Sequence, residues 1–240
     1  QAPAAALGAA WWALHPFRAE TIGWASGLMY GVAGAFALLS VLVYLRSWTA
    51  AAPGPRRIRW LVPAALLYSA SLLTYPIALG LVGVFLLIDV AEFQRAARRG
   101  VTAWPPGGWR RVLAEKLLVV VPCVSIFAVT VLAGRAASAF WPQPPPWSEF
   151  GFWMRLQQAA EAWCYYLWKP WWPTGLTPVP TWLLEPHERG ARTVLAVALV
   201  LGATAILGWR RRGRDGLWLL WLAHLAVLVP MLGLNDRPYH

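Results

Sequence analysis

The segment 13–24, ALHPFRAETIGW, places an imidazole, a guanidinium and a carboxylate in a short polar break between apolar runs. His15, Arg18 and Glu20 could form a polar site at a membrane surface. The same residues could instead begin a helix, because Pro16 suits the first helical position and a negative charge at Glu20 is favourable near a helix N-terminus. A solvated Arg–Glu pair there would contribute little stability. The elements around the segment must decide between the two interpretations.

The composition indicates a protein that contacts lipid. Of the 240 residues, 59% are hydrophobic and 13% are charged, whereas a soluble domain carries about 25% charged residues. The 18 Trp residues point the same way, because indole rings favour the boundary between membrane and water. The net charge of +11 could suggest nucleic acid, but the arginines cluster between apolar runs, so we expect no nucleic-acid partner.

Six apolar runs are candidates for transmembrane helices, because about 20 apolar residues cross a bilayer as a helix. They are 24–45, 60–74, 77–93, 117–134, 193–209 and 217–234, and the first 14 residues resemble the second half of another span. A β-barrel would alternate apolar and polar residues, which these runs do not. We predict an all-α, polytopic membrane protein with about six to seven transmembrane helices. Residues 1–240 would form one transmembrane domain and a fragment of a longer chain.

The basic residues predict the orientation of these helices. Loops 46–59, 94–116 and 210–216 hold 14 of the 21 basic residues, and such loops are typically cytoplasmic. We therefore expect an integral membrane protein with its Arg-rich loops in the cytoplasm, and we place it in the bacterial inner membrane as a separate expectation. The segment HPFRAE, the Tyr75-Pro76 turn, the loop 135–192 and the final NDRPYH would share the outer face.

The loop 135–192 predicts an interfacial helix. WPQPPPW is a stiff stretch, and Ser148 is a candidate N-cap for the helix that follows. An apolar stripe recurs at helical spacing, whereas Arg155, Gln158 and Glu161 lie off it, as in a helix that turns its apolar face to the membrane. The helix would end at KPWWPTGLTPVP, where prolines prevent its continuation.

Several polar residues have simpler structural interpretations. Cys123 and Cys164 are predicted to be packing residues, and no spacing of Cys and His supports a metal site. We expect Asp89 to pair with nearby arginines. His224 lies inside a span and is expected to bond a neighbouring helix in its neutral form.

Three segments together resemble the GT-C superfamily of membrane glycosyltransferases, in particular the O-mannosyltransferase-like branch with a tetratricopeptide tail. They are the His-Pro-x-x-x-Glu motif at residues 15–20, SLLTYPIALGLVGVFLLIDV, and YYLWKPWWPTGLTPVP. The resemblance covers most of the chain in order. Where that branch usually has Lys-Glu, this chain reads Thr74-Tyr75-Pro76.

The resemblance implies transfer of a sugar from a polyprenyl-phosphate carrier to an acceptor at the extracytoplasmic face. It implies Glu20 and His15 as catalytic residues, with a carboxylate as general base. Arg18, Lys169, Trp172 and Arg237 would bind substrate or its phosphate. Lys169 could equally be a lysine that snorkels at the interface. The sugar donor enters as a substrate, and the sequence does not support a divalent metal.

Two further functions compete with sugar transfer. A non-catalytic membrane subunit would use its abundant Trp residues for contacts with other chains. A transporter would need charged or broken helices in mid-membrane, and only His224 approaches that requirement. The expected partners are membrane lipid, a lipid-linked sugar and other membrane subunits.

Overall fold

The described part of the chain is all helical. In the computed structural model it comprises residues 2–16, 27–49, 57–100, 108–137, 148–149, 151–175 and 190–232. The helices are α1 (Ala2–Leu14), α3 (Leu28–Thr49), α4 (Ile58–Thr74), α5 (Leu81–Arg98), α6 (Gly108–Ala137), α7 (Phe152–Trp168), α9 (Ala191–Trp209) and α10 (Arg211–Leu228). Short 3₁₀ turns, η2 (Pro76–Gly80) and η3 (Val229–Met231), precede α5 and follow α10. The predicted all-α class is confirmed.

Four of the described helices are long and apolar enough to cross a membrane. These segments are Leu28–Trp48, Pro76–Arg98, Arg110–Gly134 and Ala191–Trp209. Pro3–Leu14, Ile58–Thr74 and Gly216–Leu228 are apolar but shorter. The structure is therefore that of an all-α membrane protein, and the count of six to seven spans stays a prediction, because three of its members are short for a bilayer about 30 Å thick.

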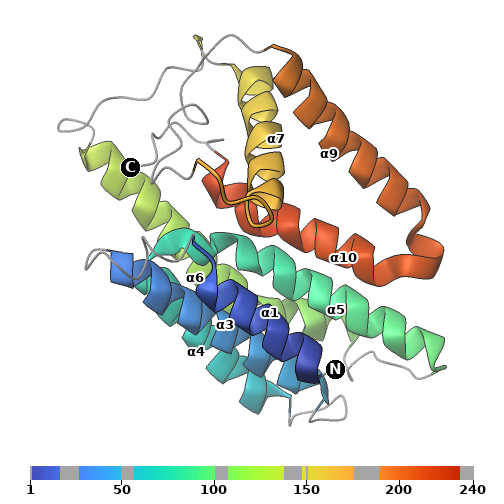
Figure 1. The fold of residues 1–240 in the computed structure, drawn as a ribbon. Coiled ribbons are helices and arrows are strands. Elements are labelled where there is room, and N and C mark those ends of the chain that lie inside the picture. Colours follow the sequence, from blue (N-terminus) through green and yellow to red (C-terminus); the bar gives the residue numbers. More distant parts are fainter. Residues whose placement is uncertain are drawn as a thin grey trace.

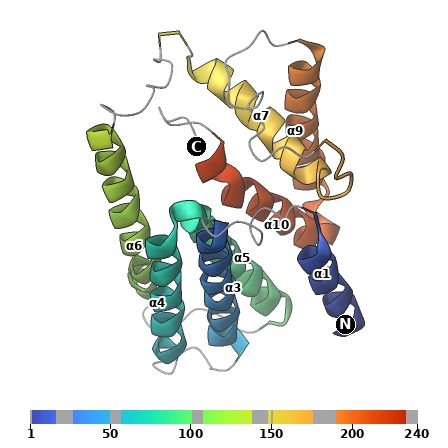
Figure 2. The same ribbon diagram turned by 60° about the vertical axis from the view of Figure 1, so that its left-hand side comes forward.

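Helices α3 to α6 form one bundle (Figures 1 and 2). The predicted turn between two helices at Tyr75-Pro76 is confirmed, because Tyr75 is extended and Pro76 begins η2. Proline suits this position, since its ring presets the helical φ angle and it lacks an N–H that would have no partner there. The Tyr75 ring lies edge-on to Tyr30, with ring centroids 4.5 Å apart, at the start of α3. Helix α3 and the C-terminal end of α4 are thus in contact through these two rings.

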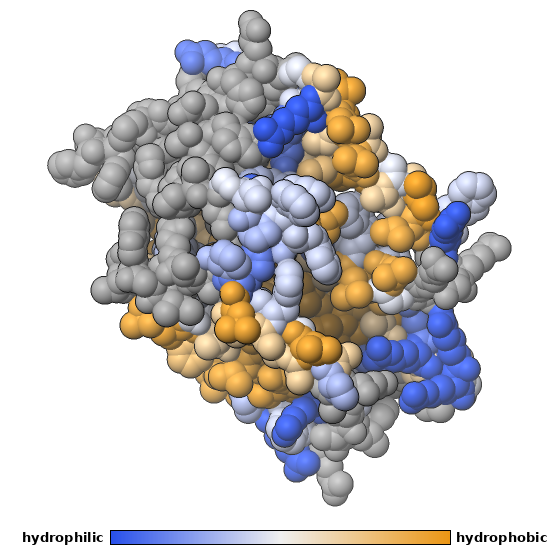
Figure 3. Space-filling view, in the orientation of Figure 1, coloured by the Kyte–Doolittle hydropathy of each residue, from blue (hydrophilic) through white to orange (hydrophobic). Residues whose placement is uncertain are grey.

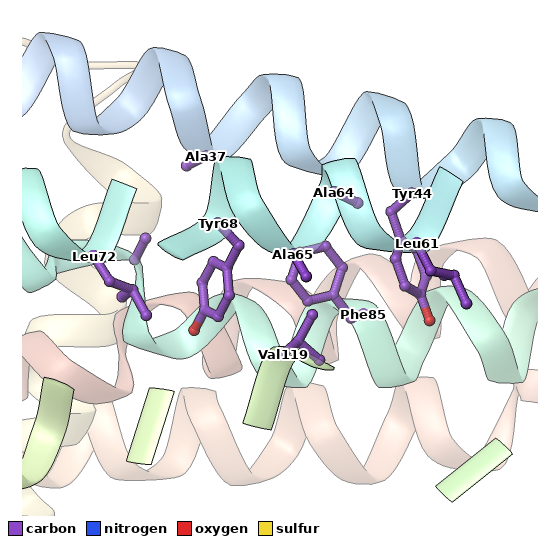
Figure 4. Packing of buried hydrophobic residues seen from close by; sticks show 10 residues of the cluster. Ala37, Tyr44, Leu61, Ala64, Ala65, Tyr68, Leu72, Phe85 and Val119 are labelled. Atoms are coloured by element: carbon purple, nitrogen blue, oxygen red, sulfur yellow. The ribbon is translucent and has the colours of Figure 1, made fainter. Parts of the chain in front are cut away.

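The bundle core combines rings with very small residues (Figure 4). Tyr44, Tyr68 and Phe85 are buried, and the Phe85 ring contacts both tyrosine rings at centroid distances of 4.7 and 5.4 Å. The Ser40 hydroxyl donates to the Ala64 carbonyl at 2.6 Å across α3 and α4. Small residues and hydroxyls that bond between helices are typical of membrane bundles, in which backbones approach closely.

The outward faces of the bundle are apolar. Large exposed side chains recur along α6, from Leu113 through Val121 and Phe127 to Leu132. Figure 3 shows hydrophobic surface over the visible helices, while strongly hydrophilic side chains collect near the end of α5. This distribution matches helices whose sides face hydrocarbon and whose ends face water.

Helices α7, α9 and α10 form a second group (Figures 1 and 2), in which the C-terminal half of α7 packs on the N-terminal half of α9. Helix α10 contacts α9 and also packs on η2 and α5, so it connects the two groups. The contact at Gly80 is very close: a β-carbon there would lie 2.2 Å from the carbonyl oxygen of Ala226. Glycine is required at this position because any side chain would collide with the α10 backbone.

Helix α7 confirms the predicted helix in the loop 135–192 but differs from it in two ways. It begins at Phe152 after Gly151, without a side-chain cap, so the prediction of Ser148 as N-cap is wrong. Its polar face is buried: Arg155, Gln158 and Glu161 are each 5% exposed or less. Trp153, on the apolar stripe, is 72% exposed. The helix therefore turns these polar residues inward together with its alanines, and directs large apolar side chains such as Trp153 outward, as expected where the surroundings are lipid.

Candidate functional site

His15 and the segment after α7 meet, although 155 residues separate them. The imidazole lies just beyond α1, is 8% exposed, and donates from Nε2 to the Pro170 carbonyl at 2.9 Å. The Trp11 ring contacts both the His15 ring and the Trp171 ring, at centroid distances of 5.8 and 6.2 Å. The structure thus brings together one end of the HPFRAE segment and the KPWW segment.

Lys169 and Trp172 belong to the same segment, which ends α7. The Lys169 ammonium donates to the Thr174 carbonyl and lies 5.6 Å from the centre of the Tyr165 ring. The Trp172 ring stacks on Trp168 at 6.1 Å, and both rings are 58% exposed. A cation beside exposed indole rings suits an interfacial position, where a phosphate and a sugar could bind. We call His15, Lys169 and Trp172 the aromatic rim.

Three of the predicted site residues lie outside the described residues. They are Glu20, Arg18 and Arg237. Their assignment to the site therefore stays a prediction. Of the segment HPFRAE, the structure places the side chain of His15 against the Pro170 carbonyl.

Sequence reasoning missed a buried polar group on α7. The Thr193 hydroxyl on α9 donates to Oε1 of Glu161, and Thr193 and Glu161 are each 3% exposed. Gln158 and Arg155 continue the same face about one and two turns earlier. The spacing of three residues between these polar side chains was a signal, but in a membrane protein a polar face can be directed either to water or into the protein. Buried ionisable groups in such proteins often mark functional sites.

Glu161 lines an open groove of about 550 Å³ between α7, α9 and α10. The groove passes Leu195, Leu199 and Ala203 of α9, and Trp221 of α10 lies at its wall. Arg192 is the second charged side chain that lines it. The space is therefore apolar with one polar end.

Cys164 also lines this groove, and its thiol contacts the Ala196 carbonyl at 3.7 Å. Burial, and then the nearby Glu161 carboxylate, raise the pKa of the Cys164 thiol above its ordinary value. Both cysteines are free and half-buried, which agrees with the predicted packing role. His224 approaches the Trp163 carbonyl on the neighbouring α7 at 3.4 Å, in agreement with its predicted partner on another helix.

A second buried polar group lies in the α3–α6 bundle, at the end opposite the contact between Tyr30 and Tyr75. Asp89 pairs with Lys116, and its Oδ1 lies 3.5 Å from the Arg57 guanidinium, which confirms the expected arginine partner and adds a lysine. Oδ1 also accepts from the Tyr44 hydroxyl at 2.7 Å and from the Trp48 indole at 3.1 Å. We call Asp89 and these four partners the Asp89 cluster. Its members come from α3, α5, α6 and the N-cap residue of α4, Arg57, so it holds the ends of these four helices together.

Comparisons with protein-family models, with curated proteins and with solved structures found no match. The fold defines the class: an all-α membrane protein with two helical groups. The apolar helices, the groove and the aromatic rim therefore carry the functional argument.

Proposed function

We propose that the chain is a membrane glycosyltransferase of the GT-C type, which transfers a sugar from a polyprenyl-phosphate carrier to an acceptor at the outer face of the bacterial inner membrane. One observation supports the proposal. Two of the three segments that resemble this superfamily, His15-Pro16 and the KPWW segment, meet through the hydrogen bond from His15 to the Pro170 carbonyl.

The aromatic rim suits the carrier's headgroup. Lys169 offers a cation for the phosphate, and the half-exposed Trp172 ring offers an apolar face against which a sugar ring can lie. His15 would position or exchange a proton, and Glu20 would act as the general base that deprotonates the acceptor hydroxyl. Arg18 and Arg237 would add positive charge for the departing phosphate. In this proposal the Arg-rich loops are cytoplasmic.

The test is sugar transfer by the full-length protein in proteoliposomes, with a radiolabelled polyprenyl-phosphate sugar as donor. We expect Glu20→Gln to lower kcat by about a hundredfold or more, because general-base catalysis contributes roughly 10²–10⁴-fold. Lys169→Gln should raise KM for the donor. Glu149→Gln is the matched control, since Glu149 is exposed in the same outer loop and has no proposed role.

Two results would overturn the proposal. The first is unchanged turnover in both Glu20→Gln and Lys169→Gln. The second is a combination of two observations: the protein transfers no polyprenyl-linked sugar, and it purifies in a fixed ratio with another membrane chain. A non-catalytic subunit would show both.

A further inference from the structure

We propose that the groove between α7, α9 and α10 binds one phospholipid of the surrounding bilayer, with a headgroup that carries a primary ammonium beside its phosphate. The groove adjoins the aromatic rim, because Trp168 lines it and stacks on Trp172. Its two charged residues, Glu161 and Arg192, are not part of the rim, and the proposal does not rest on sugar transfer. Phosphatidylethanolamine is the simplest lipid of this class.

The apolar part of the groove fits a lipid chain. Its volume of about 550 Å³ lies within the range of roughly 300–1,000 Å³ that is usual for small-molecule sites. Leu195 and Leu199 line it and are 60% and 55% exposed, so the groove is open along the side of α9. Because α9 is long and apolar enough to cross the membrane, that side faces hydrocarbon, where a lipid chain is the available occupant.

The polar end of the groove contains a carboxylate without a protein cation. Glu161 is 3% exposed and accepts from Thr193, and among the described residues no Lys, Arg or His lies within ion-pair distance of it. A buried carboxylate is costly unless a cation or several hydrogen-bond donors accompany it. An ammonium group that enters through the groove would supply both the positive charge and the N–H donors.

Arg192 supplies the complementary charge. It precedes Thr193 in α9, lines the same groove and is exposed. A guanidinium binds phosphate through two parallel N–H donors. Together, Glu161 and Arg192 present one negative and one positive charge to a headgroup that has one of each.

This charge pair selects among lipids. Phosphatidylglycerol and polyprenyl phosphate bring only negative charge, which the Glu161 carboxylate repels. Phosphatidylcholine has a quaternary nitrogen with no N–H to donate to a carboxylate. A primary ammonium has three donors. Glu161 is therefore the residue that determines headgroup preference, and Arg192 is the residue that binds any phosphate.

Cys164 provides the measurement, because it lines the groove and its alkylation should slow when a lipid fills the space. The full-length protein is purified in mild detergent, alkylated with and without added lipid, and digested, so that mass spectrometry reads Cys164 alone. Cys123, on α6, is the internal control for detergent effects. The readout is the ratio of rates with and without lipid, since the Glu161 carboxylate itself alters the reactivity of Cys164.

We expect phosphatidylethanolamine to slow Cys164 alkylation at about tenfold lower concentration than phosphatidylcholine or phosphatidylglycerol, the effect of one charge-assisted hydrogen bond. Glu161→Gln should reduce this preference to about twofold or less. Arg192→Gln alters an exposed side chain, so it should fold even if Glu161→Gln does not, and it should weaken protection by every phospholipid about tenfold. Glu92→Gln, on α5, is the matched control and should behave as wild type.

The proposal is wrong if polyprenyl phosphate or phosphatidylglycerol protects Cys164 as well as phosphatidylethanolamine does. It is also wrong if Arg192→Gln leaves protection unchanged. Both results are measured at Cys164 with variants of Glu161 and Arg192, so the proposed sugar transfer is still judged by its own assay of Glu20 and Lys169.

Discussion

Asp89 is a buried anion that two cations share. Asp89→Asn would leave Arg57 and Lys116 inside the bundle with less negative charge, and breaking a buried ion pair by removing one partner costs about 3–5 kcal/mol. We expect a loss of unfolding free energy of that size, measured by denaturation in detergent micelles. The carboxylate also accepts from Tyr44 and Trp48, which adds to the loss.

Glu92→Gln is the control for Asp89→Asn. Glu92 lies one turn away on α5 and pairs with Arg95, whose side chain is 65% exposed. Exposed pairs contribute about 0–1 kcal/mol, so this variant should unfold almost as wild type does. Equal stability losses in both variants would show that burial of Asp89 is not the cause.

The thiol of Cys164 predicts a pH dependence. Its pKa is raised by burial and by Glu161, so at a given pH less of the thiolate, the form that reacts, is present. Without lipid, alkylation of Cys164 should therefore continue to accelerate above the pH at which an ordinary thiol reaches its plateau. Glu161→Gln removes the negative charge, lowers the thiol pKa and should shift this rate profile to lower pH. An unshifted profile would indicate that Glu161 carries no charge.

At the scale of elements, the positions of the helices were predictable and the direction of one polar face was not. Apolar runs such as 60–74 and 193–209 match α4 and α9 closely, because length and composition alone determine which segments can form buried or lipid-facing helices. Arg155, Gln158 and Glu161 define a polar face, but their sequence cannot say whether water or another helix covers it. Only the position of Thr193 on α9 answers that question.

The close contact between η2 and α10 depends on the absence of a side chain at Gly80. Gly80→Ala would place its β-carbon 2.2 Å from the Ala226 carbonyl oxygen and 2.8 Å from the Val227 α-carbon, both backbone atoms. Backbone cannot rotate away as a side chain can, so we expect a loss of about 1–3 kcal/mol in unfolding free energy, the usual effect of overpacking. Thermal unfolding in detergent measures it.

Gly34→Ala is the matched control for Gly80→Ala. Gly34 lies inside α3, and a β-carbon there would have no neighbour within 4 Å. Alanine favours a helix over glycine by roughly 0.5–1 kcal/mol, so this variant should be as stable as wild type or slightly more stable. A large loss at Gly34 would mean that another surface packs against α3.

At the scale of the molecule, the two ends of the bundle differ in character, and this difference predicts the topology. Arg57, Arg95 and Arg98 lie at one end, whereas Tyr30 and Tyr75 meet at the other. In a variant without native cysteines, we expect Arg99→Cys to react with a membrane-impermeant maleimide only in inverted vesicles. Thr174→Cys should react only in right-side-out vesicles. Reaction of both from the same side would contradict the predicted orientation.

The candidate site was only partly predictable from the sequence. His15, Lys169 and Trp172 attract attention as single residues, because polar groups are rare in this chain. Their spatial relation could not be read from the sequence, since 155 residues separate His15 from Pro170. The groove is lined by side chains of α7, α9 and α10, so it depends on how these three helices pack together rather than on any local pattern.

The charges around Asp89 also bear on how the chain enters the membrane during synthesis. Arg57 and Asp89 emerge from the ribosome first, on α4 and α5, and together they are neutral. Glu115 and Lys116 follow as adjacent opposite charges on α6, with Glu115 3.2 Å from Arg57. Arg57 and Lys116 together balance Asp89 and Glu115, so once α6 has joined α4 and α5 this buried group adds no net charge to the bilayer.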